Sequence, residues 1–262
     1  MAGTISDVVR TLCLGLPEAA EVESHGAPDF RVRGRTFATY AVNHHGDGRV
    51  ALWLCLPPGG QQHYVDALPE ACFVPPYVGP RGWLGVELDR GLDWNRIDAL
   101  IREAYAHVAP DELAAAMAPP GRVSPPTEGI DPEEFDPLSP PRVRELVDGL
   151  DARCRALPEV TAIRQFGNPA WRAGKKTFAS ASRYHRRLQF HFRVGADLQS
   201  QLTMDPRYTV PAYLGHNGWI ALDAEDGVVW EEVESLMLTS YRHFALKRML
   251  KALDLPPPAD AS

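Results

Sequence analysis

Apolar residues recur at the spacing of one helical face in four segments of the chain. In the first of these, apolar side chains stand at Ile5, Val8, Val9, Leu12, Cys13 and Leu16, and Pro17 ends the pattern. Apolar positions three and four residues apart are typical of an amphipathic helix with one buried face. The same spacing occurs over residues 143–157, 94–108 and 230–244, so the sequence predicts four amphipathic helices.

Short runs of β-like residues, separated by turn residues, lie between these helices. In the first half the runs are 30–32, 36–42, 50–56 and 83–88, and in the second half 171–172, 177–182, 188–194 and 219–222. Consecutive strands joined by short turns form an antiparallel meander. Each half is therefore predicted to be an α+β unit, with an antiparallel sheet between an N-terminal and a C-terminal helix.

The two halves repeat one another. Tyr77-Val78-Gly79-Pro80-Arg81-Gly82-Trp83 matches Tyr213-Leu214-Gly215-His216-Asn217-Gly218-Trp219 at an offset of 136 residues (213 − 77). Upstream, Thr36-Phe37-Ala38 matches Thr177-Phe178-Ala179 at an offset of 141 (177 − 36), so five residues are missing from the second copy between Ala179 and Tyr213. A single repeat of this length is a duplicated domain and not a solenoid unit.

The repeat predicts the domain boundaries. We expect one copy over residues 1–118, a proline-rich and acidic linker over 119–141, a second copy over 142–255 and a flexible tail over 256–262. Eight prolines in the linker favour an extended, semi-rigid segment that buries little surface. Two copies in one chain predict a covalent pseudo-dimer in a monomeric chain.

Composition and charge narrow the classes of function. The chain carries a net charge of −7, with 45% hydrophobic and 23% charged residues, as in an ordinary globular protein. Such an acidic balance argues against a general phosphate-coating protein. Residues 142–255, however, hold 17 Lys and Arg against 13 Asp and Glu, so only the second copy is basic. The N-terminus has no signal-like pattern and no apolar run is long enough to span a membrane, so we expect a cytoplasmic protein.

The order of motifs resembles that of a known family. Each half carries, in order, a helix, Leu-Pro-Glu, a Gly-x-Pro element, Thr-Phe-Ala, the Tyr-x-Gly-x-x-Gly-Trp turn, a tryptophan and a closing helix. This order is similar to that of the bacterial MmcQ/YjbR-like family. The resemblance implies a CyaY-like, double-wing fold and, by that label, DNA binding. The association of the family's name with an antibiotic gene cluster also suggests a resistance role.

Basic residues gather in one hairpin of the second copy. Several guanidinium groups on a turn and on alternate strand positions could follow a phosphate backbone. Strict alternation over 188–194 puts Gln189, His191 and Arg193 on one strand face, which we expect to be polar and wet. The equivalent turn of the first copy has one positive charge beside Asp47. The candidate nucleic-acid-binding residues are Arg172, Lys175, Lys176, Arg183, Tyr184, Arg186, Arg187 and Arg193.

Aromatic residues suggest an alternative from another class of function. Most of them have the spacing of core residues, but a concave aromatic pocket with a few polar groups is typical of a small-molecule site. Such a pocket would bind a planar natural product by stacking. Its candidate residues are His25, Arg31, Trp53, Tyr77, Arg81, Trp83, Trp171, Tyr213 and Trp219.

No motif indicates catalysis, a cofactor or a metal. The sequence lacks a nucleophile elbow and the spacings typical of zinc sites, and Cys13, Cys55, Cys72 and Cys154 are predicted to be buried free thiols. Histidines recur in Tyr105-Ala106-His107 and Tyr241-Arg242-His243, which is more typical of a helix end than of a catalytic pair. The sequence therefore favours a binding protein without cofactor or metal.

Overall fold

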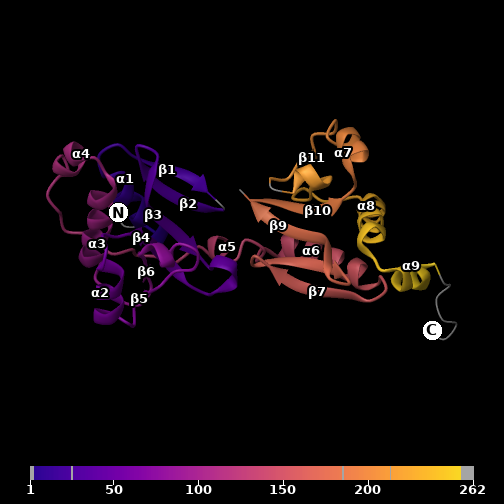
Figure 1. Cartoon of the computed structure of the whole chain (residues 1–262), viewed down its shortest axis with the longest axis horizontal. Helices are drawn as coiled ribbons and strands as arrows, with labels where there is room; N and C mark the ends of the chain where they lie inside the picture. The colour runs from indigo at the N-terminus through magenta and orange to yellow at the C-terminus, as the bar shows by residue number, and fades with distance from the viewer. Residues whose placement is uncertain (1–2, 25, 185, 213, 255–262) are drawn as a thin grey trace. The chain divides into compact units, whose positions relative to one another are not determined.

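The computed structural model describes residues 3–24, 26–184, 186–212 and 214–254, without the side chain of Tyr184. The chain divides into two compact units, Met1–Phe135 and Asp136–Ser262. In the described residues, each unit has a six-stranded antiparallel sheet flanked by helices (Figure 1). This is the predicted α+β fold in two tandem copies. The predicted tail at 256–262 lies outside the described residues.

The first unit has the strand order β1-β2-β3-β4-β6-β5. Its strands are β1 (Ala19–Ser24), β2 (Ala27–Val32), β3 (Arg35–Val42), β4 (Val50–Cys55), β5 (Cys72–Phe73) and β6 (Trp83–Glu87). Its helices are α1 (Ile5–Leu14), α2 (Gly60–Ala67), α3 (Trp94–Val108), α4 (Asp111–Ala115) and α5 (Pro132–Phe135), with short 3-10 turns η1 (His44–Gly46) and η2 (Gly79–Arg81).

The second unit repeats this topology, with the strand order β7-β8-β9-β10-β12-β11. Its strands are β7 (Val160–Gln165), β8 (Asn168–Ala173), β9 (Lys176–Tyr184), β10 (Arg187–Arg193), β11 (Tyr208–Thr209) and β12 (Trp219–Asp223). Its helices are α6 (Pro141–Arg155), α7 (Ala196–Leu202), α8 (Trp230–Phe244) and α9 (Lys247–Leu253), with the 3-10 turn η3 (Gly215–Asn217).

The strand registers define which residues correspond between the units. Ala38 pairs with Leu54, and Ala179 pairs with Phe192, so the offset falls from 141 to 138 (192 − 54) across the β3–β4 and β9–β10 hairpins. Leu54 pairs with Leu84 and Phe192 with Ile220, which lowers the offset to 136 (220 − 84). The five missing residues are thus divided between the hairpin and the segment around α7.

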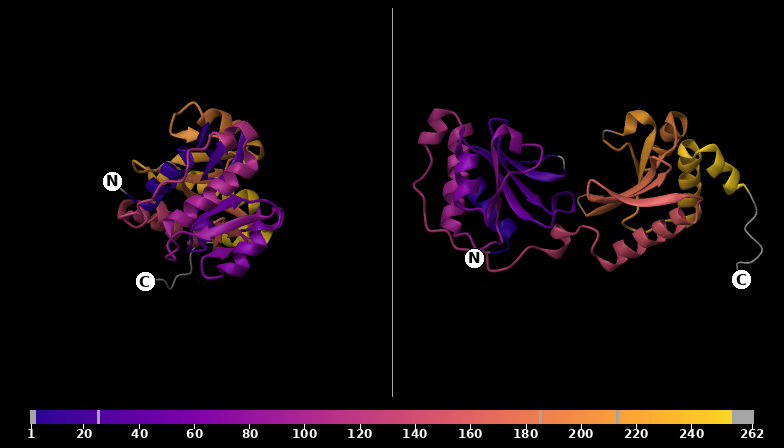
Figure 2. Two further views of the ribbon diagram at one scale, coloured as in Figure 1. Left: turned by 90° about the vertical axis from the view of Figure 1, so that its left-hand side faces the viewer. Right: turned by 60° about the horizontal axis from the view of Figure 1, so that its bottom comes forward.

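The long closing helix of each unit covers one face of its sheet. Helix α3 lies against β3 and β4, and α8 lies against β9 and β10 (Figure 2). The Tyr105 hydroxyl donates a hydrogen bond to the Pro17 carbonyl (2.6 Å), and that of Tyr241 donates to the Pro158 carbonyl (2.7 Å). The repeated Leu-Pro-Glu motif and the repeated helix tyrosine therefore hold each other in place.

A glutamine fixes the repeated turn in both units. The side-chain amide of Gln61 in α2 donates to the carbonyls of Gly79 (2.8 Å) and Trp83 (2.5 Å). Gln199 in α7 donates in the same way to Gly215 (2.9 Å) and Trp219 (2.7 Å). The turn ends at a glycine with positive φ, Gly82 or Gly218, a conformation that favours glycine. One side chain thus sets the start of β6 or β12.

The second sheet face differs between the units. In the first unit it carries a small apolar cluster of Ala41, Ala51 and Trp53, with Phe73, Val78 and Trp83 packed against it. By register, the counterparts of Ala41, Ala51, Trp53 and Phe73 are Ser182, Gln189, His191 and Thr209. The prediction of a wet face fails at His191, which is 8% exposed. Burial lowers its pKa to about 4, and its Nδ1 has no hydrogen-bond partner.

The proline-rich segment packs mainly on the first unit. Val123, Ile130 and Phe135 contact the core of that unit, whereas Leu138 contacts the core of the second. The amides of Thr127 and Glu128 donate to the Gly3 carbonyl (3.0 and 3.3 Å). The segment was expected to bury little surface, but its few apolar residues pack on the cores of the units. The division between the units falls within it, after Phe135.

We expect Tyr241→Phe to lower the free energy of unfolding by about 1 kcal/mol, because it removes one hydrogen bond and keeps the ring. Burial and Glu159 raise the pKa of Tyr241 to about 12, so the phenol is a donor at neutral pH. Urea unfolding measures the change. Tyr105→Phe should have a similar effect on the first unit, and an unchanged midpoint in both variants would contradict the proposed role of the contact.

Candidate ligand-binding site

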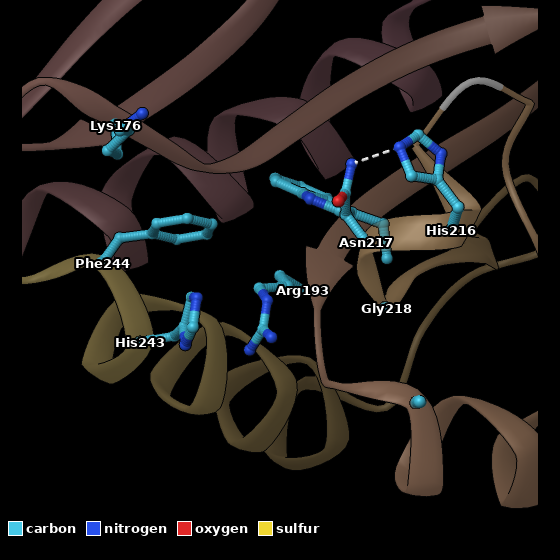
Figure 3. A pocket seen from close by; sticks show the side chains of 9 residues that line it. Lys176, Arg193, His216, Asn217, Gly218, His243 and Phe244 are labelled. Carbon is cyan, nitrogen blue, oxygen red and sulfur yellow. Dashed lines mark hydrogen bonds between the residues drawn. The ribbon is translucent and has the colours of Figure 1, made fainter.

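A hollow of about 560 Å³ lies at one end of the second unit's sheet (Figure 3). Its walls come from the starts of β9 and β12, the end of β10, the turn η3 and the end of α8. The residues that line it are Lys176, Arg193, Ala196, His216, Asn217, Gly218, Trp219, His243 and Phe244.

The local fold explains why these side chains meet. Lys176 begins β9 directly after the turn at Gly174, whose φ is positive. Arg193, the last residue of β10, pairs with Trp219, the first of β12. The glutamine-held turn precedes Trp219 and brings His216 and Asn217 to the rim. The start of β9, the end of β10 and the turn η3 before β12 thus lie at the same end of the sheet.

The hollow is basic. No carboxylate is among its lining residues, and in the described part of the chain neither Lys176 nor Arg193 forms an ion pair. Burial, followed by the neighbouring Arg193, lowers the pKa of His243. The Asn217 amide donates to Nε2 of His216 (2.8 Å). An anion placed here would meet two permanent positive charges without an acidic competitor.

Two aromatic rings give the hollow an apolar wall. The Trp219 and Phe244 rings lie 6.1 Å apart between centroids, tilted by 34°. Figure 3 shows Phe244 and His243, the last residues of α8, on the same side of the hollow as Lys176, with Asn217 and His216 on the other side. A planar molecule with a negative charge would find both an aromatic surface and cations here.

Most residues of the predicted basic hairpin do not line this hollow, and two of its arginines form ion pairs. Arg183 is only 7% exposed and bonds to Glu225 (2.9 Å), and Arg187 bonds to Asp223 (2.5 Å) with Asp226 at 3.4 Å. Arg172 is half-buried, with its Nε lacking a partner, whereas Lys175 and Arg186 are exposed. The side chain of Tyr184 lies outside the description. Of the predicted residues whose side chains the structure describes, Lys176 and Arg193 alone line the hollow.

The residues of the predicted aromatic pocket fall into separate groups, and its tryptophans and tyrosine in the first unit lie close together. Trp171 is 1% exposed in the main core, where its indole donates to Asp151 (2.7 Å), so it lines no pocket. Trp53 and Trp83 pack together in the apolar cluster of the first unit. The His44 ring contacts both the Trp53 ring (4.8 Å between centroids) and the ring of Tyr77 (5.9 Å), which is 64% exposed. Arg31 bonds to Asp29 (2.8 Å), and Arg81 is exposed. His25 and Tyr213 lie outside the described residues. Among the described members of this group, Trp219 alone lines the hollow.

Sequence reasoning did not group His216, Asn217, His243 and Phe244 as a site. The available signal was the divergence of the repeat, because Pro80-Arg81 in the first copy is replaced by His216-Asn217 in the second. Their proximity to Lys176 depends on the order of β9, β10 and β12 in the sheet and on the packing of α8 against β9 and β10, which the sequence pattern alone does not give.

Among the described residues, no group of three or more His, Cys, Asp or Glu side chains is arranged to hold a metal ion. Of the helices in that part of the chain, none is long and apolar enough to cross a membrane. Cys13, Cys72 and Cys154 are buried and Cys55 is partly exposed, all as free thiols.

Two copies of one α+β domain, each with a glutamine-held turn before its last long strand, define a tandem-repeat protein. The model of the YjbR family matches residues 14–107 and 155–243, one match in each unit. The chain therefore belongs to the YjbR family. Among curated proteins, none matches the chain. A solved structure, protein DR2400 of Deinococcus radiodurans with its DUF419 domain, is similar at 19% identity and a TM-score of 0.37 over 48% of this chain and 96% of that one.

We expect Glu225→Gln to lower the free energy of unfolding by about 3 kcal/mol at pH 7, because it removes the carboxylate that pairs with the buried Arg183 guanidinium. Burial opposes ionisation of Glu225, but hydrogen bonds from Arg183 and the Leu188 amide outweigh it and lower its pKa below the ordinary 4.5. This stabilisation is present above about pH 4.5 and is lost as pH falls through the lower folded value.

Urea unfolding of wild type and variant at several pH values tests this. The difference should shrink below about pH 4. The matched control is Asp226→Asn, since Asp226 is 84% exposed and its contact with Arg187 should contribute less than about 0.5 kcal/mol. Equal effects of the two variants would show that the buried pair has no special role.

Proposed function

We propose that this protein is a binding protein whose second unit binds a small planar molecule bearing a negative charge. The observation that carries the proposal is the meeting of Lys176 and Arg193 with the rings of Trp219 and Phe244 in one hollow, with no carboxylate among its lining residues. Two permanent cations and an aromatic wall are complementary to an aromatic carboxylate, sulfonate or phosphate.

The size of the hollow supports a small ligand. Its volume of about 560 Å³ falls within the range of roughly 300–1,000 Å³ that is usual for small-molecule sites. The net charge of the chain is −7, so a basic hollow is a local exception to the charge of the whole chain. An anionic small molecule therefore needs only this site, whereas a polyanion would meet the acidic remainder of the surface.

DNA, which the family resemblance implied, is the second candidate. The observation in its favour is that Lys175 and Lys176 are adjacent and exposed at the β8–β9 turn, beside Arg193. The ion pairs of Arg183 and Arg187 weaken this candidate, because each such contact neutralises a cation that would otherwise meet a phosphate.

We expect 2-naphthoate to bind and to be detected by isothermal titration calorimetry. Lys176→Gln and Arg193→Gln should each weaken binding about tenfold, the effect of losing one charge-assisted hydrogen bond. Lys175→Gln is the matched control, because it removes the neighbouring charge outside the hollow, and it should change the affinity less than about twofold.

The neutral isostere 2-naphthamide tests the charge requirement. Equal affinities for the acid and the amide, or equal effects of Lys175→Gln and Lys176→Gln, would overturn the proposal. A mobility shift of a short DNA duplex that disappears with moderate salt and in Arg186→Gln/Arg187→Gln, without 2-naphthoate binding, would favour the second candidate.

The affinity for 2-naphthoate should rise as pH falls from 8 to 5.5. In the unliganded protein the lowered pKa of His243 keeps the ring neutral near pH 7, and a bound anion favours its protonated form. A one-unit increase in the pKa on binding corresponds to an affinity gain of up to about tenfold. The charged groups that line the hollow with His243 are Arg193 and Lys176, and His216 is the second histidine among the lining residues.

Calorimetry across this pH range on His243→Gln and His216→Gln separates the two histidines. A flattened pH profile in His243→Gln alone is expected. A profile that stays steep in His243→Gln but flattens in His216→Gln would assign the linkage to His216.

A further inference from the structure

The first unit carries a similar set of groups at the equivalent positions of the repeat. Cys55 ends β4 and pairs with Trp83 at the start of β6, as Arg193 pairs with Trp219. Arg35 begins β3 as Lys176 begins β9, and His107 stands next to the end of α3 as His243 does in α8. Arg81 lies in η2, at the position that Asn217 holds in η3.

The positively charged side chains of the two sets stand at different positions, but each set contains two of them. The second unit has Arg193 where the first has Cys55, and the first has Arg81 where the second has Asn217. Each set therefore keeps two permanent positive charges, a tryptophan and a histidine. Independent drift at these two positions has no reason to preserve this balance, whereas a shared requirement for an anion does.

Two of these first-unit groups, Arg35 and Arg81, lie near enough to Cys55 to influence its thiol. Burial raises the pKa of the Cys55 thiol, and both Arg35 and Arg81 oppose that rise, with no carboxylate among its influences. Both arginines are exposed, and in the described residues neither forms an ion pair. Two guanidinium groups thus approach one half-buried thiol from β3 and from η2.

We infer that the first unit holds a second anion site, formed by Arg35, Arg81, Trp83 and His107 beside Cys55, so that the chain binds two planar anions. The choice of a planar anion rests on the function proposed for the second unit. The first-unit site is built differently, since Val108 replaces Phe244 and Pro80 replaces His216. Compared with the second-unit site, it has two guanidinium groups that can each bind an anion in a bidentate way, and it has less aromatic surface. It also has a thiol, Cys55, at its edge.

Cys55 provides a reporter for this site alone. The other three thiols, Cys13, Cys72 and Cys154, are buried, so the neutral reagent 4,4′-dithiodipyridine should react first at Cys55. The Cys55 thiolate attacks the disulfide, forms a mixed disulfide and releases one 4-thiopyridone, whose absorbance is followed. A bound anion shields the thiol and offsets the two guanidinium charges that favour its thiolate, so the reaction should slow.

The experiment combines calorimetry and thiol kinetics on the full chain with 2-naphthoate. We expect two equivalents to bind and the reaction of Cys55 to slow at least fivefold at saturation, with no slowing by 2-naphthamide. Arg35→Gln/Arg81→Gln should remove one equivalent and the protection, and Arg35→Lys/Arg81→Lys should restore part of both. Lys176→Gln/Arg193→Gln should remove the other equivalent and keep the protection. Cys55→Ser identifies the reacting thiol.

The outcomes separate this inference from the proposed function. One equivalent that is lost in Lys176→Gln/Arg193→Gln, with Cys55 never protected, overturns the first-unit site and leaves the proposed function. One equivalent that protects Cys55 and survives Lys176→Gln/Arg193→Gln supports the first-unit site and overturns the proposed function. Absence of any binding overturns both.

Discussion

The double hydrogen bond from Gln61 or Gln199 is the interaction on which the rest of each unit depends. One amide group holds two backbone carbonyls, at the start of the 3-10 turn and at the first residue of the strand that follows. Loss of that donor would take one hydrogen bond from each carbonyl, and that of Gly79 or Gly215 would keep only its bond from the Gly82 or Gly218 amide. The turn sets where β6 or β12 joins the sheet, and hence which residue faces Cys55 or Arg193.

This constraint explains how two sites can share a framework and differ in chemistry. The backbone positions at the end of β4 or β10 and in the turn are fixed by register, so the side chains there can vary without moving the strands. Cys55 against Arg193 and Arg81 against Asn217 are such variations. The same freedom appears on the second sheet face, where an apolar cluster around Trp53 corresponds to a polar set around His191.

The sequence predicted the elements that have a periodic buried face. The four long helices and the central strands are of this kind, and the repeat placed them twice. Strands β1 and β7 were missed because neither contains a fully buried residue, so they carry no alternating signal. Helix α2 was missed because none of its residues is buried.

The site was less predictable because it depends on contacts between distant residues. The pairing of Arg183 with Glu225 joins residues 42 apart and removes a cation that composition alone counts as available. His191 alternates as a surface residue should, yet it is buried, because alternation identifies a face and not what covers it. The sequence predicted Lys176 in the nucleic-acid surface and Trp219 in the aromatic pocket. The folded sheet places both in the wall of one hollow.

The packing of the proline-rich segment determines how the two units can be separated in the laboratory. A fragment that stops at Ala118 would lack Val123, Ile130 and Phe135, and the core that they cover would become exposed to solvent. It would also lose the contact between the Asn43 side chain and the Phe135 carbonyl (3.0 Å). A fragment that ends after Phe135 keeps these contacts, so that position is the natural cut for expressing each unit alone.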